Sequence, residues 1–427
     1  MESIVILFIV FFVTLLLGVP FAWSLVASCI CSLTLTSGFP LMLIAQRMYT
    51  GGERYVLLAV FFFLLAGAIM QHGGISSRLV NFSKACVGHI SGGLSIVVLL
   101  TCMMFAALSG SSVATTAAIG AMLYPELVKA KYPKGYASAL PVAGGTLGIV
   151  IPPSIVFVVY GNVTGTSVSK LLISGIVPGV LGGLAMCVYA YFYAKRHGFD
   201  AGKEKFSFKR LAAATKDAIW ALMMPVIILG GIYSGMFTPT ESAAVAVVYG
   251  LFVATVIHKE LTRAKFWDIV IDSVKGTANI LLLIMAATIF GYAMTVYNVP
   301  TLFTNMMSSI ITSKVSFLLF LNVLLIILGM LMDTGAIVLI VAPLIYPIAI
   351  HYGIDPVHLG CIVVFNLAVG QATPPFGNCL FAAVSATNQD IVTLAKNAIP
   401  FVLVLYAVVL AVSFIPGLAM YLPSLMF

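Results

Sequence analysis

Two pairs of consecutive prolines, Pro152-Pro153 and Pro374-Pro375, interrupt long apolar stretches of the chain. Proline has no backbone N–H and disfavours helix at the residue before it, so each pair leaves carbonyl oxygens of the preceding turn without helical partners. In a lipid bilayer an unpaired backbone group costs several kcal/mol, so a helix breaks there only where the freed groups face protein, a cavity or a ligand. Such carbonyls, together with nearby hydroxyls, suit a dehydrated monovalent cation such as Na⁺. A kink that serves only helix packing is the alternative.

Two other apolar runs, 91–128 and 316–350, are each nearly twice as long as a membrane span and are broken in the middle by small or polar residues. The breaks are Leu108-Ser109-Gly110-Ser111-Ser112 and Met332-Asp333-Thr334-Gly335. We interpret both runs as re-entrant helical hairpins, with ordinary pairs of spans as the alternative. Half-helices that begin at such breaks present N-terminal N–H groups with partial positive charge, which suits an anionic substrate.

The two sets of breaks belong to an internal repeat at an offset of 222 residues. The matching residues are Ser111-Ser112 with Asp333-Thr334, Tyr124-Pro125 with Tyr346-Pro347, Gly148 with Gly370, and Pro152-Pro153 with Pro374-Pro375. Five predicted crossings separate the first Tyr-Pro pair from the second. Because five is odd, the two copies run through the bilayer in opposite senses. An inverted repeat of this kind is typical of secondary transporters.

The composition requires lipid as the solvent. Of 427 residues, 62% are hydrophobic and 8% are charged, whereas soluble domains are about 25% charged. The seven cysteines lack metal-ligand spacing, and no phosphate-binding Gly-rich motif is present, so ATP is not expected to drive the protein. No clustered acid, base or nucleophile set appears, which argues against an enzyme.

The predicted topology places the N-terminus outside the cytoplasm. Single spans are expected at 3–18, 20–38, 55–71, 136–163, 168–194, 218–236, 240–257, 277–295, 357–386 and 397–420. The gaps 72–90, 129–135, 195–217, 258–276 and 387–396 then hold 17 of the 21 Lys and Arg residues and are expected in the cytoplasm. The four remaining basic residues lie in segments expected outside the cytoplasm: Arg47, Arg54, Lys170 and Lys314. The amphipathic segments 258–276 and 298–313 are predicted to lie along the interface as arms.

Two acidic residues stand out by position. Asp333 lies well inside an apolar run, where burial costs roughly 2.5–3.5 kcal/mol on insertion scales, so we expect it to bind a cation or to cap a half-helix; simple N-cap packing stays open. Glu241 follows Thr238-Pro239-Thr240 and is expected in the first turn of a helix capped by one of the threonines. We assign Glu241 a structural role rather than contact with substrate.

These residues resemble a known family. The segments Gly18-Val19-Pro20-Phe21-Ala22, Ser109-Gly110-Ser111-Ser112, Ile151-Pro152-Pro153-Ser154, Thr238-Pro239-Thr240-Glu241 and Gln371-Ala372-Thr373-Pro374-Pro375 look like those of the large membrane subunit of tripartite ATP-independent periplasmic (TRAP) transporters. The resemblance covers essentially the whole chain. It implies an all-α inner-membrane protein in which a transport domain moves as an elevator against a scaffold, with Na⁺ as the coupling ion. It also implies a periplasmic binding protein that delivers an organic acid, and a small four-helix membrane subunit.

The expected division of the chain into domains follows the two repeats. Residues 1–90 form a first scaffold portion, 91–165 the first transport repeat, 166–315 a second scaffold portion with arm helices, 316–386 the second transport repeat, and 387–427 a C-terminal transmembrane helix. Since the chain starts directly with the large subunit, we expect the small subunit to be a separate polypeptide. Among substrates, the chain leans toward the sialic acid branch, with C4-dicarboxylates as the other main class.

The resemblance also implies site residues. One Na⁺ site would use Ser109, Ser111, Gly148, Ile151 and Pro153, largely through carbonyl oxygens. The offset of 222 places a second Na⁺ site at Asp333, Gly370, Thr373 and Pro375. Leu331 occupies the position equivalent to Ser109, so the two sites differ. The substrate-region candidates are Gly110, Ser112, Thr334, Gly335 and Gln371. A stand-alone Na⁺/carboxylate symporter or ion antiporter, and an integral-membrane enzyme or assembly subunit, are the competing hypotheses.

Overall fold

The computed structural model describes residues 2–199, 206–311 and 313–426, and this part of the chain contains helices and no strands. Residues 200–205 of the gap 195–217 and residue 312 of the segment 298–313 lie outside the described residues. Within the described ranges, eight helical stretches are long and apolar enough to cross a membrane. The predicted all-α membrane protein is therefore confirmed.

The helices follow one another without intervening domains. Before the first repeat come α1 (Glu2–Leu16), α2 (Phe21–Cys29) with the π-helical η1 (Ile30–Thr36), α3 (Leu41–Gly52), the 3₁₀ turn η2 (Tyr55–Leu57), α4 (Leu58–His72) and α5 (Ile75–Val87). The first repeat comprises α6 (Gly93–Ser109), α7 (Ser112–Lys129), α8 (Lys134–Gly145), the 3₁₀ turn η3 (Thr146–Ile149) and α9 (Ile155–Thr164).

The remaining elements include the second repeat. The connection consists of α10 (Val168–Ser174), α11 (Ile176–His197), α12 (Phe208–Tyr233), α13 (Pro239–Phe252) with the π-helical η4 (Val253–Ile257), α14 (Arg263–Val296) and α15 (Val299–Ile310). The second repeat comprises α16 (Lys314–Leu331), α17 (Thr334–His351), α18 (Pro356–Gly370) and α19 (Asn378–Thr387), and it is followed by α20 (Ile391–Phe414) and α21 (Gly417–Met426).

Both apolar runs form helical hairpins, and their helices end at equivalent residues. The first hairpin turns after Ser109 and the second after Leu331, and the returning helices begin at Ser112 and Thr334, in each case 222 residues apart. The broken helices match as well, since α8 and α18 both stop before a proline pair and resume as α9 and α19. In both breaks the peptide bond between the two prolines is cis.

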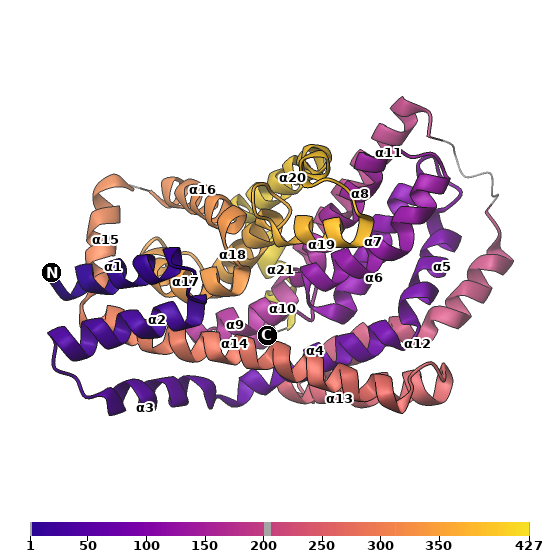
Figure 1. Cartoon of the computed structure of the whole chain (residues 1–427). Helices are drawn as coiled ribbons and strands as arrows, with labels where there is room; N and C mark the ends of the chain where they lie inside the picture. The colour runs from indigo at the N-terminus through magenta and orange to yellow at the C-terminus, as the bar shows by residue number, and fades with distance from the viewer. Residues whose placement is uncertain (1, 200–205, 312, 427) are drawn as a thin grey trace.

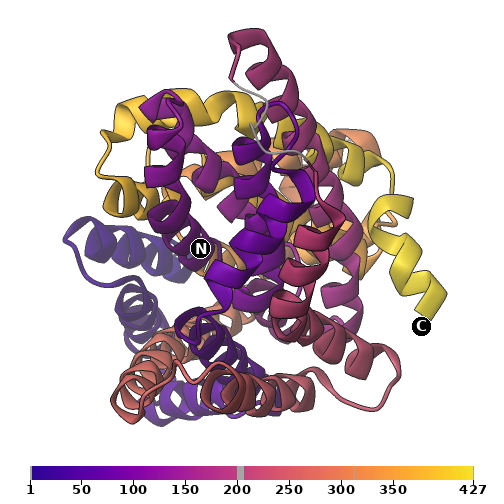
Figure 2. The same ribbon diagram turned by 90° about the vertical axis from the view of Figure 1, so that its right-hand side faces the viewer.

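The helices outside the repeats include a layer along one side of the molecule. Figure 1 shows α14 lying beside α3 and α4 along the lower edge of the molecule, with α13 beside α4, and Figure 2 shows the same layer from the end. The prediction that 258–276 is a separate arm is wrong, because α14 is one helix of 34 residues, about 51 Å long at 1.5 Å per residue. No proline interrupts 263–296, and single glycines are tolerated within a helix.

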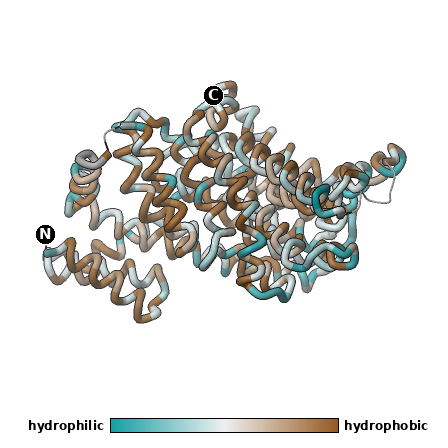
Figure 3. The backbone as a smooth tube through the Cα atoms, turned by 90° about the horizontal axis from the view of Figure 1, so that it is seen from above, coloured by the Kyte–Doolittle hydropathy of each residue, from teal (hydrophilic) through white to brown (hydrophobic). Residues whose placement is uncertain are grey.

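The Lys/Arg-rich gaps meet at one end of the molecule, which we call the basic end. The contacts that join them are Arg78 to Asp217 at 3.4 Å, Arg78 to Glu260 at 2.9 Å, Lys84 to Glu126 at 2.6 Å, and His258 Nδ1 to the Gly73 carbonyl at 3.1 Å. Hydrophilic stretches are correspondingly most prominent at the right-hand end of the molecule in Figure 3. At the opposite end, the Tyr352 hydroxyl donates to the Ile311 carbonyl at 2.6 Å. The meeting of Lys/Arg-rich gaps at one end agrees with the prediction that these gaps lie on the same side of the membrane.

A buried polar cluster joins α16, α18 and α20. The Asn366 amide donates to Asn322 Oδ1 at 3.0 Å, and the Ser413 hydroxyl donates to the same oxygen at 3.2 Å. All three side chains are at most 2% exposed. Since a polar group buried in a membrane protein needs a partner, this cluster fixes how the second repeat packs on α20.

Replacing Asn322 with leucine should lower the free energy of unfolding by about 1–3 kcal/mol, because the buried Asn366 amide loses an acceptor, while Ser413 keeps the Val409 carbonyl at 2.9 Å. Denaturation of the purified protein in detergent measures this. Val323→Leu, at a neighbouring exposed position of α16, serves as the control. Equal stability of the two variants would show that the cluster contributes nothing to the fold.

Candidate cation and substrate site

The tip of the first hairpin is seated on the first broken helix. The Ser112 hydroxyl donates to the Thr146 carbonyl at 3.1 Å. A Cβ atom added at Gly148 would overlap the backbone of Ser111, and one added at Gly110 would lie 2.7 Å from the Pro153 carbonyl oxygen. Gly110 also has a φ of +62°, which favours glycine. The backbones approach this closely only because both positions lack a side chain.

Several carbonyl oxygens at this junction are free. Within the described residues, the carbonyls of Gly148, Ile151 and Pro153 accept no hydrogen bond, because the helix stops and the prolines supply no N–H. The Ser154 hydroxyl satisfies the Ile149 carbonyl at 2.5 Å instead. The structure thus places Ser111 of the tip against Gly148, and Gly110 against Pro153, and leaves the carbonyls of Gly148, Ile151 and Pro153 without hydrogen bonds from the described residues.

Hydrogen bonds with residues of α7 fix the positions of the hydroxyl groups at the first hairpin tip. Ser109 and Thr115 share a hydrogen bond of 2.8 Å between their hydroxyls, and Thr115 also donates to the Ser111 carbonyl at 2.8 Å. Ser111 caps α7 by accepting from the Ala114 N–H at 3.3 Å. The sequence analysis missed Thr115, although it stands four residues after Ser111 and therefore on the same helix face.

The second tip is arranged differently. Asp333 caps α17, since one carboxylate oxygen accepts from the Gly335 N–H at 2.9 Å, and the other accepts from the Asn378 amide at 3.1 Å. The Phe376 N–H donates to the Met330 carbonyl at 3.1 Å, which joins the tip to the second broken helix. Asp333 is exposed, so its carboxylate remains accessible. The predicted capping role is confirmed, and Asn378 is a partner that the sequence did not indicate.

The other residues predicted for the second Na⁺ site, Gly370, Thr373 and Pro375, lie at the second broken helix. The Gly370 carbonyl accepts from the Thr373 N–H at 3.0 Å, and the Thr373 hydroxyl donates to the Val369 carbonyl at 2.9 Å. The Gly370 carbonyl is therefore occupied, whereas the equivalent carbonyl of Gly148 is free in the described part of the chain.

Both tips open onto one cavity of about 220 Å³. All five substrate-region candidates line it, as do Ser111 and Asp333: the candidates are Gly110, Ser112, Thr334, Gly335 and Gln371. Within it the Gln371 amide donates to the Thr334 hydroxyl at 2.5 Å. Leu64 of α4 and Ile280 of α14 close the side away from the repeats. The cavity thus combines two helix N-termini with hydroxyl and amide groups, which is the chemistry that binds an anion.

Comparison with known proteins identifies the family of this chain. A family model described as "Tripartite ATP-independent periplasmic transporter, DctM component" matches residues 8–418. The chain belongs to this family of TRAP permeases. It is 42% identical to the C4-dicarboxylate TRAP transporter large permease of Pseudomonas aeruginosa, with 89% of each chain covered. It is 35% identical to the sialic acid TRAP transporter large permease of Vibrio cholerae, covering 96% of this chain and 95% of that one.

The chain is also similar to a longer relative and to a transporter of known structure. The chain is 40% identical to the isethionate TRAP transporter permease of Oleidesulfovibrio alaskensis over 98% of its own length and 66% of that protein. The fold resembles the crystal structure of the Alcanivorax borkumensis YdaH transporter, with a TM-score of 0.66, 16% identity, and 88% and 87% of the two chains covered. TRAP permeases are transport proteins, so the chain is not an enzyme. Large permeases of this family work with a small membrane subunit and a periplasmic binding protein.

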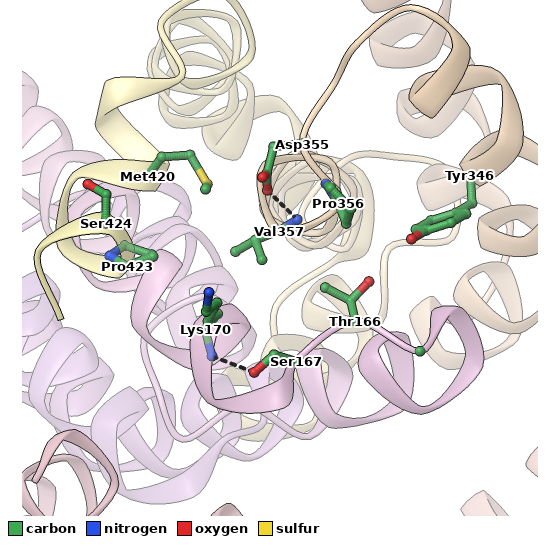
Figure 4. A pocket seen from close by; sticks show the side chains of 11 residues that line it. Thr166, Ser167, Lys170, Tyr346, Asp355, Pro356, Val357, Met420, Pro423 and Ser424 are labelled. Atoms are coloured by element: carbon green, nitrogen blue, oxygen red, sulfur yellow. Dashed lines mark hydrogen bonds between the residues drawn. The ribbon is translucent and has the colours of Figure 1, made fainter. Parts of the chain in front are cut away.

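A larger cavity in this TRAP permease lies away from both tips. It measures about 510 Å³ and is found between α17, α18, α21 and the connection after α9. Figure 4 shows Lys170 and Ser167 on one wall and Asp355 at the start of α18 on another. Asp355 is occupied as a helix cap, accepting from the Val357 N–H at 2.7 Å. No predicted site residue lines this cavity, so its size alone does not make it the functional site.

Glu241, the other acidic residue singled out, has the expected structural role. Its carboxylate accepts from the Thr238 N–H at 2.7 Å, and its own N–H donates to the Thr238 hydroxyl at 3.3 Å. This reciprocal pair is a capping box at the start of α13. Glu241 lies outside the cavity between the tips.

Proposed function

We propose that this TRAP permease imports an organic acid together with Na⁺. The observation that supports this most directly is the meeting of two hairpin tips at one cavity, beside a broken helix with three free carbonyl oxygens. The carbonyls of Gly148, Ile151 and Pro153 provide oxygen ligands for a cation, while the N-termini of α7 and α17 face the anion. Cation and substrate then bind next to each other, which is what coupling requires.

The basic end is the cytoplasmic face in this proposal, and the N-terminus is periplasmic. Of 21 Lys and Arg residues, 17 lie in the gaps assigned to that end, as the positive-inside rule demands. The tip cavity would be loaded from the opposite, periplasmic end, where a binding protein delivers the acid. This orientation places the protein in the bacterial inner membrane as an importer.

The moving body comprises the two repeats in an elevator mechanism. We add α10, α11 and α20 to it, because α11 packs against α6 and α20, and α10 packs against α9 and α18. The layer of α3, α4, α13 and α14 serves as the scaffold. Leu64 and Ile280 supply its apolar contacts at the tip cavity, so the repeats could slide past the scaffold without breaking hydrogen bonds at these two positions.

The substrate is an organic acid, and C4-dicarboxylate and sialic acid are the two classes to test first. Relatives named for C4-dicarboxylate, isethionate and sialic acid are 42%, 40% and 35% identical to this chain. These values do not favour the sialic acid branch indicated by the sequence. A monoanion carried with two Na⁺ moves one net charge, which contributes about 2.3 kcal/mol per 100 mV, or roughly fiftyfold accumulation.

Uptake into proteoliposomes tests the proposal. The permease is reconstituted with the small subunit, an inward Na⁺ gradient is imposed, and labelled acids are supplied with a panel of periplasmic binding proteins. Uptake should require both Na⁺ and one matching binding protein. Uptake driven by Na⁺ without any binding protein would instead show a stand-alone symporter, and accumulation without a Na⁺ gradient would rule out Na⁺ coupling.

A further inference from the structure

A second cavity lies between α14, the C-terminal end of α9 and the middle of α17. It measures about 240 Å³, and its polar lining includes Arg54, Asn162 and Thr295. We call it the outer cavity. It follows the tip cavity along the same seam: Val159 and Ile280 line the tip cavity, and Asn162 and Ile284, about one helical turn further along, line the outer one.

The outer cavity contains hydrogen-bond donors that have no acceptor. Arg54 donates through Nη1 to the Asn162 carbonyl at 2.7 Å and lies 3.4 Å from Asn162 Oδ1. In the described part of the chain, Nε and Nη2 of Arg54 and Nδ2 of Asn162 have no partner, and Arg54 forms no ion pair, even with the adjacent Glu53. Asn162 is only 7% exposed, whereas Arg54 is exposed, so its free N–H groups are accessible to a ligand from solvent.

A purely structural role accounts for part of this arrangement. Asn162 lies in the last turn of α9, where unpaired carbonyls attract a positive charge, so Arg54 acts as a C-terminal cap. That role uses one nitrogen of the guanidinium. The remaining N–H groups of Arg54 and the amide of Asn162 form a set that matches a carboxylate, which accepts two parallel hydrogen bonds from arginine.

We propose that the outer cavity is an anion subsite, in which Arg54 and Asn162 hold a carboxylate of the organic acid before it reaches the tip cavity. The subsite lies at the end opposite the basic end, where the acid arrives in an importer, and this part of the inference rests on the proposed function. Arg54 comes from the scaffold side and Asn162 from the moving repeat. Movement of the repeat would therefore separate the two groups and release the acid toward the tips.

The first test measures the local potential and needs no transport. Thr295 is exposed and lines the outer cavity, so Thr295→Cys places a thiol there. Its labelling rates are compared for an anionic reagent, 2-sulfonatoethyl methanethiosulfonate, and a cationic one, the trimethylammonium analogue. The anion-to-cation rate ratio should fall at least about fivefold when Arg54→Gln is added. The protein without Thr295→Cys gives the background from the native cysteines, and an unchanged ratio would overturn the subsite.

The second test measures initial uptake rates against the concentration of acid-loaded binding protein. Arg54→Gln should raise KM about tenfold with a smaller effect on the maximal rate. Arg47→Gln is the matched control, since it removes the same charge from a residue that stacks on Tyr292 at 4.3 Å and does not line the cavity. If Arg54→Gln has the same KM as Arg47→Gln, or changes the maximal rate alone, Arg54 has only a structural role as the cap of α9. If the unaltered protein takes up no acid with Na⁺, the proposed function fails, and the labelling test still decides whether the cavity attracts anions.

Discussion

Gly148→Ala is expected to reduce Na⁺-dependent uptake about ten- to hundredfold. The added methyl group would overlap the carbonyl and the following amide of Ser111, which are backbone atoms and cannot rotate away. Overpacking of this kind costs typically 1–3 kcal/mol, or about one to two powers of ten in an equilibrium constant. The hairpin tip would have to lift off the broken helix, separating Ser109 and Ser111 from the free carbonyls. Initial uptake rates at subsaturating Na⁺ measure the loss.

The control for this variant is Gly230→Ala. Gly230 lies within α12, and a Cβ atom added there would meet nothing within 4 Å, so alanine should be neutral or slightly stabilising. Size-exclusion profiles and melting temperatures of both variants show whether each remains folded. A folded Gly148→Ala protein that transports at the unaltered rate would mean that close seating of the tip on the broken helix is not needed for transport.

The repeat made much of the fold predictable. Residues that terminate helices recur at a constant offset, so the ends of the hairpin helices and the positions of both breaks followed from prolines and small polar residues. The segment 258–276 was misjudged for a physical reason. An amphipathic stretch has the same composition whether it lies along the interface or extends a spanning helix beyond the lipid, and only packing against neighbouring helices distinguishes the two.

The candidate site was only partly predictable. The breaks alone predicted free carbonyls and hydroxyls at the tips and proline pairs, and the resemblance to the family assigned particular residues such as Ser109 and Gly148 to a site. Thr115 and Asn378 were missed, because their roles arise after the tips have folded back on other elements. The offset also predicted a second cation set at Asp333, with Leu331 opposite Ser109 indicating that the two sets differ. Asp333 reaches Asn378, since its longer side chain caps α17 with one oxygen and leaves the other free for an amide.

Asp333→Asn is expected to raise the Na⁺ concentration for half-maximal uptake about tenfold without destabilising the protein. Asp333 is the one acidic side chain among the described residues that line the tip cavity, and a carboxylate that faces a site for an anionic substrate needs a cation to offset its charge. Asparagine caps helices as well as aspartate does, so this variant removes the charge and keeps the cap. A Na⁺ titration of uptake measures the change.

Asp333→Ala completes the test, because it removes the cap and the charge together. It should show the same shift in Na⁺ dependence and, in addition, a loss of about 1 kcal/mol in stability. If each of the two sites contributes one Na⁺ to the transport of a monoanion, disabling the second site leaves an electroneutral cycle. At Na⁺ concentrations too low to fill the weakened site, uptake by both variants should then no longer respond to an imposed membrane potential, whereas accumulation by the unaltered protein rises about fiftyfold per 100 mV. If Asp333→Asn shows the same Na⁺ titration and voltage response as the unaltered protein, Asp333 serves only as a helix cap.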